Sequence, residues 1–349
     1  MGATHVERPH ILDGALGTYL ESHHGQTLND SPLWSAHLLT TDPQLLQRVH
    51  TEYLDAGADI ITTATYQASA EGFRQIGVSD PTAIRHHFCQ AIQLAVDSCE
   101  EYVQRHPEAF ALASPTHLAS AGNRPLPQVA ISLGSYGAVV GQGAEYTGDF
   151  GQGCSVETLR AFHRDRLVLV RDILDKNHST AWARTVKWLA LETVPCLMEL
   201  TALVLALEDA WAADKDGKGL PAVWVTMACS ATGNLKHGEP LSACVPILAN
   251  CPWIAAIGVN CTYPEPGAMD YLIDTFRAHT NKPLVCYPNA QQWNTTTNAW
   301  HQQSYIFPNT FGEMAMQWHQ RGATIMGGCC RTSPAHILAI AQRLRPQPH

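Results

Sequence analysis

Three cysteines lie where short apolar runs give way to polar loops. Cys261 ends such a run in IGVNCTYP, and Cys329 and Cys330 form a doublet in GGCCRT. Zinc binds thiolate sulfur in tetrahedral geometry, and a site with three protein ligands keeps a fourth position open for water or substrate. A substrate thiol in that position would lose its proton, because the metal stabilises the thiolate. The three cysteines are therefore a candidate zinc site for chemistry on a thiol.

The spacing of these cysteines does not by itself require a metal. No CxxC pair frames Cys261 or the doublet, and the chain holds 11 cysteines. Free cysteines are commonly small buried hydrophobic residues, and the remaining cysteines are interpreted in this way. The zinc interpretation depends on whether the fold brings the three thiols together.

The elements that would bring them together are strands that alternate with helices. A helical pattern follows each of several β-rich runs, which is typical of a parallel sheet. Asp42 with Pro43 and Ser333 with Pro334 are typical helix starts, and residues 82–105 and 156–177 have helical periodicity. The expected strands cover residues 10–15, 58–66, 128–135, 187–193, 222–229, 253–261, 282–288 and 323–329. We therefore predict an α/β fold of the (β/α)8 TIM barrel type.

The length of the chain allows either one large barrel or two domains. A chain of 349 residues, 45% of them hydrophobic, can bury a large core, and no linker divides it. We expect residues 1–349 to form a single domain.

The charge and the amino terminus limit the partners of the protein. The formal charge is -9 and no cluster of Lys and Arg is present, which argues against nucleic-acid binding. The first ten residues, MGATHVERPH, contain no apolar signal core, and no apolar run reaches the roughly 20 residues of a membrane span. We expect a cytoplasmic protein that acts on small molecules, without nucleic-acid or membrane partners. The sequence does not indicate its oligomeric state.

Polar residues follow most of the predicted strands. Barrel enzymes place their sites at the carboxyl ends of the strands, so residues at these ends should meet on one face. This convergence strengthens the case for a metal, because core cysteines have no reason to prefer the loop-facing ends of strands. The residues expected there are Asp13, Thr63, Glu192, Asn260, Asn289, Cys261, Cys329 and Cys330.

Aromatic residues in the loops after the second, third and seventh strands could serve a cationic ligand. An aromatic face attracts a cation, but the same residues could simply cover the mouth of the barrel. The residues concerned are Tyr66, Tyr136, Tyr146, Trp293 and Trp300. Both interpretations are open for each of them, and Asn260 and Asn289 could likewise be turn residues instead of ligand contacts.

Motifs at the predicted strand ends resemble those of the homocysteine S-methyltransferases. They are DGALGTYL, ITTATYQAS, GSYGA with GAEYTGDF, LALETVP, GVNC, YPNA and GGCC, and they extend from about residue 10 to residue 340. The family is a zinc-dependent (β/α)8 barrel with sulfonium-dependent, betaine-dependent and cobalamin-dependent members. One departure is Ala15, which stands where the family often has glycine, and we expect an ordinary negative φ there.

The resemblance implies roles for the residues at the strand ends. It assigns Cys261, Cys329 and Cys330 as ligands of one Zn²⁺ per chain. It implies that Asp13 and Glu192 hold the amino group of homocysteine and that Thr63 lies near the substrate. The expected reaction is methyl transfer from S-methylmethionine or S-adenosylmethionine to the thiolate of L-homocysteine, forming L-methionine. The alternatives are a betaine-dependent enzyme and a non-enzymatic zinc or thiol-redox protein on the same barrel.

Overall fold

Eight parallel strands form one sheet in the computed structural model, which describes residues 8–110, 124–141, 143–177, 179–211, 220–297 and 299–345. The strands are β1 His10–Ile11, β2 Ile60–Thr62, β3 Gln128–Gly134, β4 Val186–Val194, β5 Ala222–Ala228, β6 Ile254–Asn260, β7 Leu284–Tyr287 and β10 Ile325–Met326. Their order is β1-β10-β7-β6-β5-β4-β3-β2. A parallel bridge between Leu12 and Ile60 joins the first strand to the last, so the sheet closes into a barrel. The predicted (β/α)8 barrel is confirmed.

Each predicted run contains a strand, but several strands are shorter than predicted. The run 10–15 forms only the two-residue β1, and 323–329 forms only β10. Beyond β1 a side-chain hydrogen bond replaces a backbone hydrogen bond of the sheet, because the Asp13 carboxylate accepts the Thr62 N–H at 2.7 Å. The chain therefore leaves the sheet early where it builds loops at the carboxyl ends of the strands.

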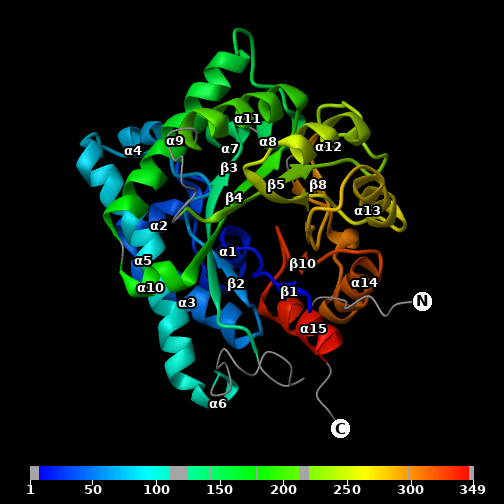
Figure 1. Ribbon diagram of the computed structural model, residues 1–349, viewed down its shortest axis with the longest axis horizontal. Coiled ribbons are helices and arrows are strands. Elements are labelled where there is room, and N and C mark those ends of the chain that lie inside the picture. Colours follow the sequence, from blue (N-terminus) through cyan, green and yellow to red (C-terminus); the bar gives the residue numbers. More distant parts are fainter. Residues whose placement is uncertain are drawn as a thin grey trace.

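Helices surround the barrel (Figure 1). They are α1 Gly17–His24, α2 Leu38–Thr41, α3 Pro43–Asp55, α4 Ala70–Gln75, α5 Pro81–Arg105, α6 Pro107–Phe110, α7 Tyr136–Val140, α8 Ala144–Thr147, α9 Val156–Lys176, α10 Thr180–Thr185, α11 Leu197–Trp211, α12 Leu241–Asn250, α13 Ala268–His279, α14 Pro308–Gln320 and α15 Pro334–Leu344. The predicted caps are present: Asp42 accepts the Leu45 N–H at 3.1 Å, and Ser333 forms a capping box at the start of α15. A short hairpin of β8 Trp293–Asn294 and β9 Ala299–Trp300 follows β7 and was not predicted.

The core has two layers, one inside the barrel and one between the sheet and the helices. The inner cluster draws on all the strands of the barrel or on residues next to them: Leu12, Ile60, Ala130, Ala190, Trp224, Ala256, Val285, Tyr287 and Ile325. Side chains alternate across a strand, so Ala190 and Glu192 face the same side of β4. Glu192 therefore faces the inside of the barrel near the carboxyl end of that strand.

A buried carboxylate closes the opposite end of the barrel. Asp59 directly precedes β2 and is fully buried. Its carboxylate accepts the Ile11 N–H at 2.9 Å and a hydrogen bond from Arg345. Asp59 thus joins β1, β2 and the end of α15 at the amino ends of the strands.

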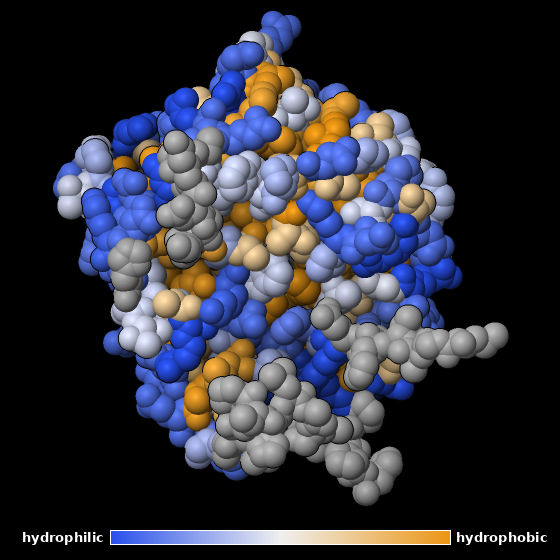
Figure 2. Space-filling model, in the orientation of Figure 1, coloured by the Kyte–Doolittle hydropathy of each residue, from blue (hydrophilic) through white to orange (hydrophobic). Residues whose placement is uncertain are grey.

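The surface drawn in Figure 2 is mainly hydrophilic, with apolar residues showing toward the middle of this face. Within the ranges that the structure describes, no helix combines the length and the apolar character needed to cross a membrane.

Candidate metal and substrate site

The fold brings the three predicted cysteines together at the carboxyl ends of the strands. Cys261 directly follows β6, and Cys329 and Cys330 lie in the loop after β10. The sulfur of Cys329 is 2.7 Å from that of Cys261 and 4.0 Å from that of Cys330. Their sulfur atoms all lie within 4.8 Å of one another, and no other group of three His, Cys, Asp or Glu side chains in the described residues could hold a metal.

The three thiols fit the donor set of a zinc site. Zinc to sulfur bonds of about 2.3 Å in a tetrahedron place the sulfurs roughly 3.8 Å apart. The Cys329 to Cys330 distance is near that value, and the shorter Cys261 to Cys329 distance of 2.7 Å still exceeds the roughly 2.05 Å of a disulfide. All three cysteines are free thiols.

Hydrogen bonds among the thiols shift the pKa values of Cys261 and Cys330 in opposite directions. A hydrogen bond shared with Cys329 raises the pKa of Cys261 well above its usual range, and burial adds to this. Hydrogen bonds from Cys261 and Cys329 hold the pKa of Cys330 well below its usual range. Without a cation the cluster therefore favours one thiolate, because three thiolates at this distance would repel one another.

Local backbone geometry directs the cysteines into the cluster. Cys261 has φ 48°, a left-handed conformation that is uncommon for a residue with a side chain. Thr332 donates to the Cys329 carbonyl at 2.7 Å and accepts the Ala15 N–H at 3.0 Å. Gly328 is required beside it, because a Cβ there would lie 2.4 Å from Thr332 Oγ1. The doublet loop is thus fixed to the loop after β1.

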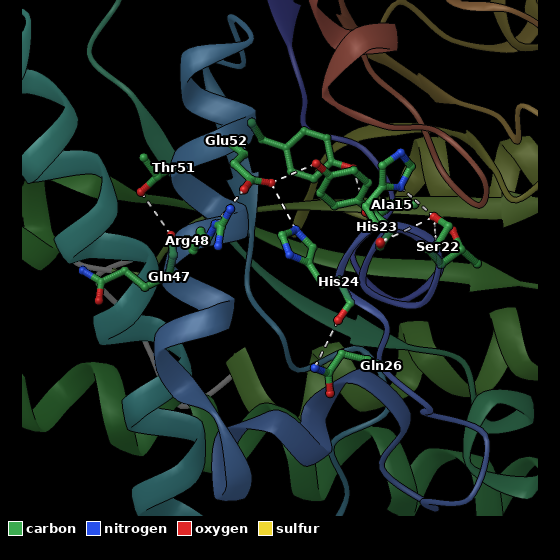
Figure 3. A network of polar contacts seen from close by, with 12 residues as sticks. Ala15, Ser22, His23, His24, Gln26, Gln47, Arg48, Thr51 and Glu52 are labelled. Atoms are coloured by element: carbon green, nitrogen blue, oxygen red, sulfur yellow. Dashed lines mark hydrogen bonds and ion pairs between the residues drawn. The ribbon is translucent and has the colours of Figure 1, made fainter.

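The loop after β1 is fixed in turn by α1 and α3. The Tyr53 hydroxyl donates to the Ala15 carbonyl at 2.6 Å. Glu52 on α3 accepts from Arg48 at 3.0 Å and lies 3.3 Å from His24 of α1 (Figure 3). Ala15 is not among the described residues with positive φ, as expected for alanine at this position.

Asp13 and Glu192 lie at the same end of the barrel as the cysteines. Both are buried, with 4% and 8% exposure. Asp13 accepts from the Thr62 hydroxyl at 3.0 Å as well as from its N–H. Glu192 accepts from the Tyr287 hydroxyl at 3.0 Å and from the Ser132 hydroxyl. Neither carboxylate has a cationic partner among these contacts, so each is suited to an ammonium group of a ligand.

Burial controls the acidity of both carboxyl groups. It raises the pKa of Asp13 to about 8, although the hydrogen bonds from Thr62 oppose the shift. Burial also raises the pKa of Glu192 to about 7, against the hydrogen bonds from Ser132 and Tyr287. Because the charged forms are disfavoured without a partner, a bound cation should draw protons off both groups.

A cavity of about 610 Å³ connects these groups. Its wall includes the three cysteines, Asp13, Thr63 and Glu192, together with three further acids, Glu21, Asp30 and Glu145. No Lys, Arg or His belongs to the described wall. The cavity is therefore electrostatically suited to ligands that carry positive charge.

The candidate aromatic residues separate into two groups. Tyr66, Tyr146, Trp293 and Trp300 line the cavity. The Tyr146 hydroxyl lies 3.5 Å from the Cys330 sulfur, and its ring stacks on Trp293 with centroids 6.2 Å apart. Tyr136 is outside the wall and packs its ring against Phe150 and Phe162.

Asn260 and Asn289 do not belong to the wall of this cavity, although Asn289 lines a smaller pocket next to Cys261. The Asn260 side chain accepts the Thr193 N–H at 3.0 Å and donates to the Thr193 hydroxyl at 2.7 Å. Thr193 has φ 67°, so Asn260 stabilises an uncommon backbone conformation. Asn289 accepts the Cys330 N–H at 3.0 Å. Their contacts in this structure position the residues of the wall, which is one of the two roles that the sequence left open for them.

Several residues of the site were not singled out from the sequence. Ser132 and Tyr287 hold Glu192, and Glu145 presents a buried oxygen without a hydrogen-bond partner in the described structure. The period-2 pattern of β3 and β7 would have placed Ser132 and Tyr287 inside the barrel. Glu145 belongs to the GAEYTGDF motif, but nothing in that motif distinguished it from its neighbours as a cavity residue.

The raised pKa values predict how ligand binding and stability depend on pH. The sequence leads us to expect that Asp13 and Glu192 bind the ammonium group of homocysteine, and L-methionine tests this expectation because it carries the same ammonium group but no thiol. We expect its affinity for the protein to increase from pH 6 to pH 8, as Glu192 and Asp13 lose their protons at about 7 and about 8. The free energy of unfolding of the ligand-free protein should decrease over the same range, because the folded state holds protons that the unfolded state has released. Calorimetric titration and urea unfolding would measure these effects, and a flat methionine affinity would contradict the assignment.

A (β/α)8 barrel with clustered thiols and carboxylates at the carboxyl ends of its strands is the architecture of a barrel enzyme acting on a small molecule. The sequence model of the family "Homocysteine S-methyltransferase" matches residues 10–344, and the chain belongs to this family. It is a methyltransferase.

Relatives and solved structures agree with this membership. The chain is 35% identical over 337 residues to homocysteine S-methyltransferase 4 of Zea mays, across 96% of this chain and 89% of that protein. It is 33% identical to homocysteine S-methyltransferase YbgG of Bacillus subtilis, across 95% and 93%. The metallated form of the homocysteine methyltransferase MmuM from Escherichia coli superposes with a TM-score of 0.72 at 32% identity, across 97% and 96%.

Proposed function

We propose that the protein is a zinc-dependent enzyme that transfers a methyl group from a sulfonium donor to the thiolate of L-homocysteine, forming L-methionine. The donor would be S-methylmethionine or S-adenosylmethionine. The observation that supports this most is the convergence of three thiols within 4.8 Å on a cavity wall that holds acids and no described basic side chain. The metallated form of MmuM is a further support.

Cys261, Cys329 and Cys330 would hold one zinc ion per chain. Zinc bound there would supply stabilisation of the substrate thiolate near neutral pH, where a free thiol of pKa about 8.5 is mostly protonated. Asp13 and Glu192 would bind the ammonium group of homocysteine at the other end of that substrate. Thr63 lies in the wall beside them, and its hydroxyl is held by the Ser132 N–H at 3.0 Å.

The methyl group moves between two sulfur atoms without a proton transfer. The homocysteine sulfur forms a bond to the methyl carbon while the bond from that carbon to the donor sulfonium breaks. The donor leaves as a neutral thioether, so no general acid is needed. The protein contributes by holding the two sulfurs and the methyl carbon in line, an effect of orientation that can be worth about 7 to 11 kcal/mol.

The charge of the cavity favours a sulfonium donor over betaine. S-Methylmethionine and S-adenosylmethionine carry a net positive charge, whereas betaine is neutral overall. The five acids of the described wall, Asp13, Glu21, Asp30, Glu145 and Glu192, attract the net positive donors more strongly. The alternative of a non-enzymatic zinc or redox protein is not supported, because the chain belongs to a family of methyltransferases.

A comparison of donors tests this proposal. With homocysteine as acceptor, we expect kcat/KM for S-methylmethionine or S-adenosylmethionine to exceed that for betaine by at least about 100-fold, since binding differences of ~3 kcal/mol are typical of charged contacts. Methionine formation by the zinc-loaded protein would be followed chromatographically, with the chelated protein as control. Turnover with betaine and none with either sulfonium compound would establish the betaine-dependent alternative.

We further propose that the enzyme acts in the cytoplasm as a single domain and binds no nucleic acid. All 11 cysteines are free, which is usual for a reducing compartment. The formal charge of -9 supports the absence of nucleic-acid partners.

A further inference from the structure

Helices α7 and α8 cover one side of the cavity, and we call them the cover. Ala138, Val139 and Val140 of α7 and Glu145 and Tyr146 of α8 belong to the cavity wall. Tyr146 reaches the cysteine cluster, since its hydroxyl lies 3.5 Å from the Cys330 sulfur. The position of the cover therefore sets the shape of the cavity beside the reacting sulfur.

The two helices of the cover are in close backbone contact. A Cβ on Gly137 of α7 would lie 2.4 Å from the backbone nitrogen of Glu145 in α8. Only glycine allows the two backbones to approach so closely. Because of this contact, the position of α7 determines where the residues of α8 lie. The start of α7 thus controls where Glu145 and Tyr146 stand.

A buried carboxylate holds the start of α7. Glu199, in the first turn of α11, is fully buried. Its Oε1 accepts the N–H of Tyr136, the first residue of α7, at 2.5 Å and lies 2.8 Å from Nε2 of His163 on α9. Figure 1 shows α7, α8 and α11 close together in the upper part of the molecule.

A buried cation holds the residue on the other side of the turn. Arg166 of α9 donates to the Gly134 carbonyl at the end of β3, and its guanidinium lies 4.1 Å from the centroid of the Phe162 ring. Burial lowers the pKa of Arg166 to about 10, so it stays protonated at neutral pH. Burial also lowers the pKa of His163, which leaves a neutral ring that can donate to Glu199. Three side chains of α9 and α11 thus fix the backbone where β3 turns into α7.

Burying the polar groups of Glu199 and Arg166 costs more free energy than apolar packing of α9 on α11 would. Glu199 Oε2 and two nitrogens of Arg166 are buried without a hydrogen-bond partner in the described structure. A buried charge is expensive, and an apolar pair would serve the packing of α9 on α11 equally well. What apolar residues could not supply is a hydrogen bond to the Tyr136 N–H.

We propose that Glu199 is a positioning residue of the methyl transfer: its hydrogen bond to the Tyr136 N–H holds the cover, so that Glu145 and Tyr146 face the donor. The proposal rests on the proposed function in that the cavity admits a methyl donor. Glu199 touches no cavity atom itself and acts only through the cover.

Two substitutions at one position isolate this hydrogen bond. Tyr136→Pro removes the N–H, and Tyr136→Ala keeps it, while both remove the ring. Proline suits the first position of a helix, and Ser135 before it has ψ 164°, the extended conformation that proline requires of its predecessor. In the zinc-loaded protein we expect kcat/KM for the donor to be about tenfold lower for Tyr136→Pro than for Tyr136→Ala, the effect of one charge-assisted hydrogen bond. Zinc content and homocysteine affinity should be equal in the two variants.

The second comparison is between two substitutions of Glu199, Glu199→Gln and Glu199→Ala. The amide oxygen of Glu199→Gln can still accept the Tyr136 N–H, so this variant should recover most of the kcat/KM that Glu199→Ala loses. Equal kcat/KM in Tyr136→Pro and Tyr136→Ala would overturn the proposal, even if Glu199→Ala fails to fold. So would equal losses in Glu199→Gln and Glu199→Ala. Wild-type turnover reports separately on the proposed function: if no sulfonium donor is used, that function falls, and the variants are compared with the donor that is used.

Discussion

Replacing Cys330 with alanine is expected to remove zinc and methyl transfer from the protein while leaving the barrel folded. The change leaves two of the three clustered thiols, Cys261 and Cys329. Loss of a residue that merely supports a metal ligand typically costs 10- to 100-fold in affinity or activity, so loss of a ligand should reduce activity by more than about 100-fold. The fold should survive because Cys330 lies in a loop after β10 and is not part of either hydrophobic cluster.

The measurements are zinc content by atomic absorption, methionine formation and the far-ultraviolet circular dichroism spectrum. Cys244→Ala is the matched control, because Cys244 is a fully buried thiol on α12 that does not line the cavity. We expect the control to keep one zinc ion per chain and wild-type turnover. Full zinc content in Cys330→Ala, or full activity in a zinc-free preparation, would refute the assignment of the three cysteines.

The sequence allowed the barrel and the cysteine cluster to be predicted for one physical reason. Side chains at the carboxyl ends of parallel strands meet on one face, so Cys261, Cys329, Asp13 and Glu192 could be placed together once the strands were recognised. The recognition itself depended on β-rich runs separated by helical segments, such as 187–193, which lies within β4. Strand ends were less certain, because side-chain hydrogen bonds such as that of Asp13 replace the ladder.

The partners of these residues could not be predicted, because they depend on barrel closure. Tyr287 of β7 reaches Glu192 of β4, although the two strands are not neighbours in the sheet. The alternation of β7 shows that Tyr287 faces inward but not which side chain lies opposite. The same limit applies to Asn260, whose partner Thr193 has a left-handed φ that no residue type there signals. Tyr136 and Tyr146 lie in the same loop segment of the sequence, and only the structure shows that Tyr146 lines the cavity whereas Tyr136 does not.

Replacing Glu192 with glutamine is expected to raise the KM for L-homocysteine about 10- to 100-fold, the usual effect of losing a charge-assisted hydrogen bond to a buried group. Tyr287 and Ser132 donate to different oxygens of Glu192, so the amide oxygen can accept from one of these hydroxyls while the amide NH2 donates to the other, and the local structure should persist. What it loses is the negative charge for the ammonium group. Zinc content should stay at the wild-type level, because Glu192 belongs to β4 and not to the cysteine cluster.

Two further measurements distinguish lost substrate binding from general damage in this variant. Asp59→Asn makes the same change in a fully buried carboxylate at the other end of the barrel, so it should lower stability without raising the KM for homocysteine. In Glu192→Gln, the increase of methionine affinity near pH 7 should become smaller, because Glu145 is then the cavity acid left with a pKa of about 7, and the increase due to Asp13 near pH 8 should remain. An unchanged homocysteine KM together with an unchanged pH profile would mean that Glu192 does not bind the ammonium group. A shift in both observables, with wild-type zinc content and no such shift in Asp59→Asn, would identify the Glu192 carboxylate as a group that binds the ammonium.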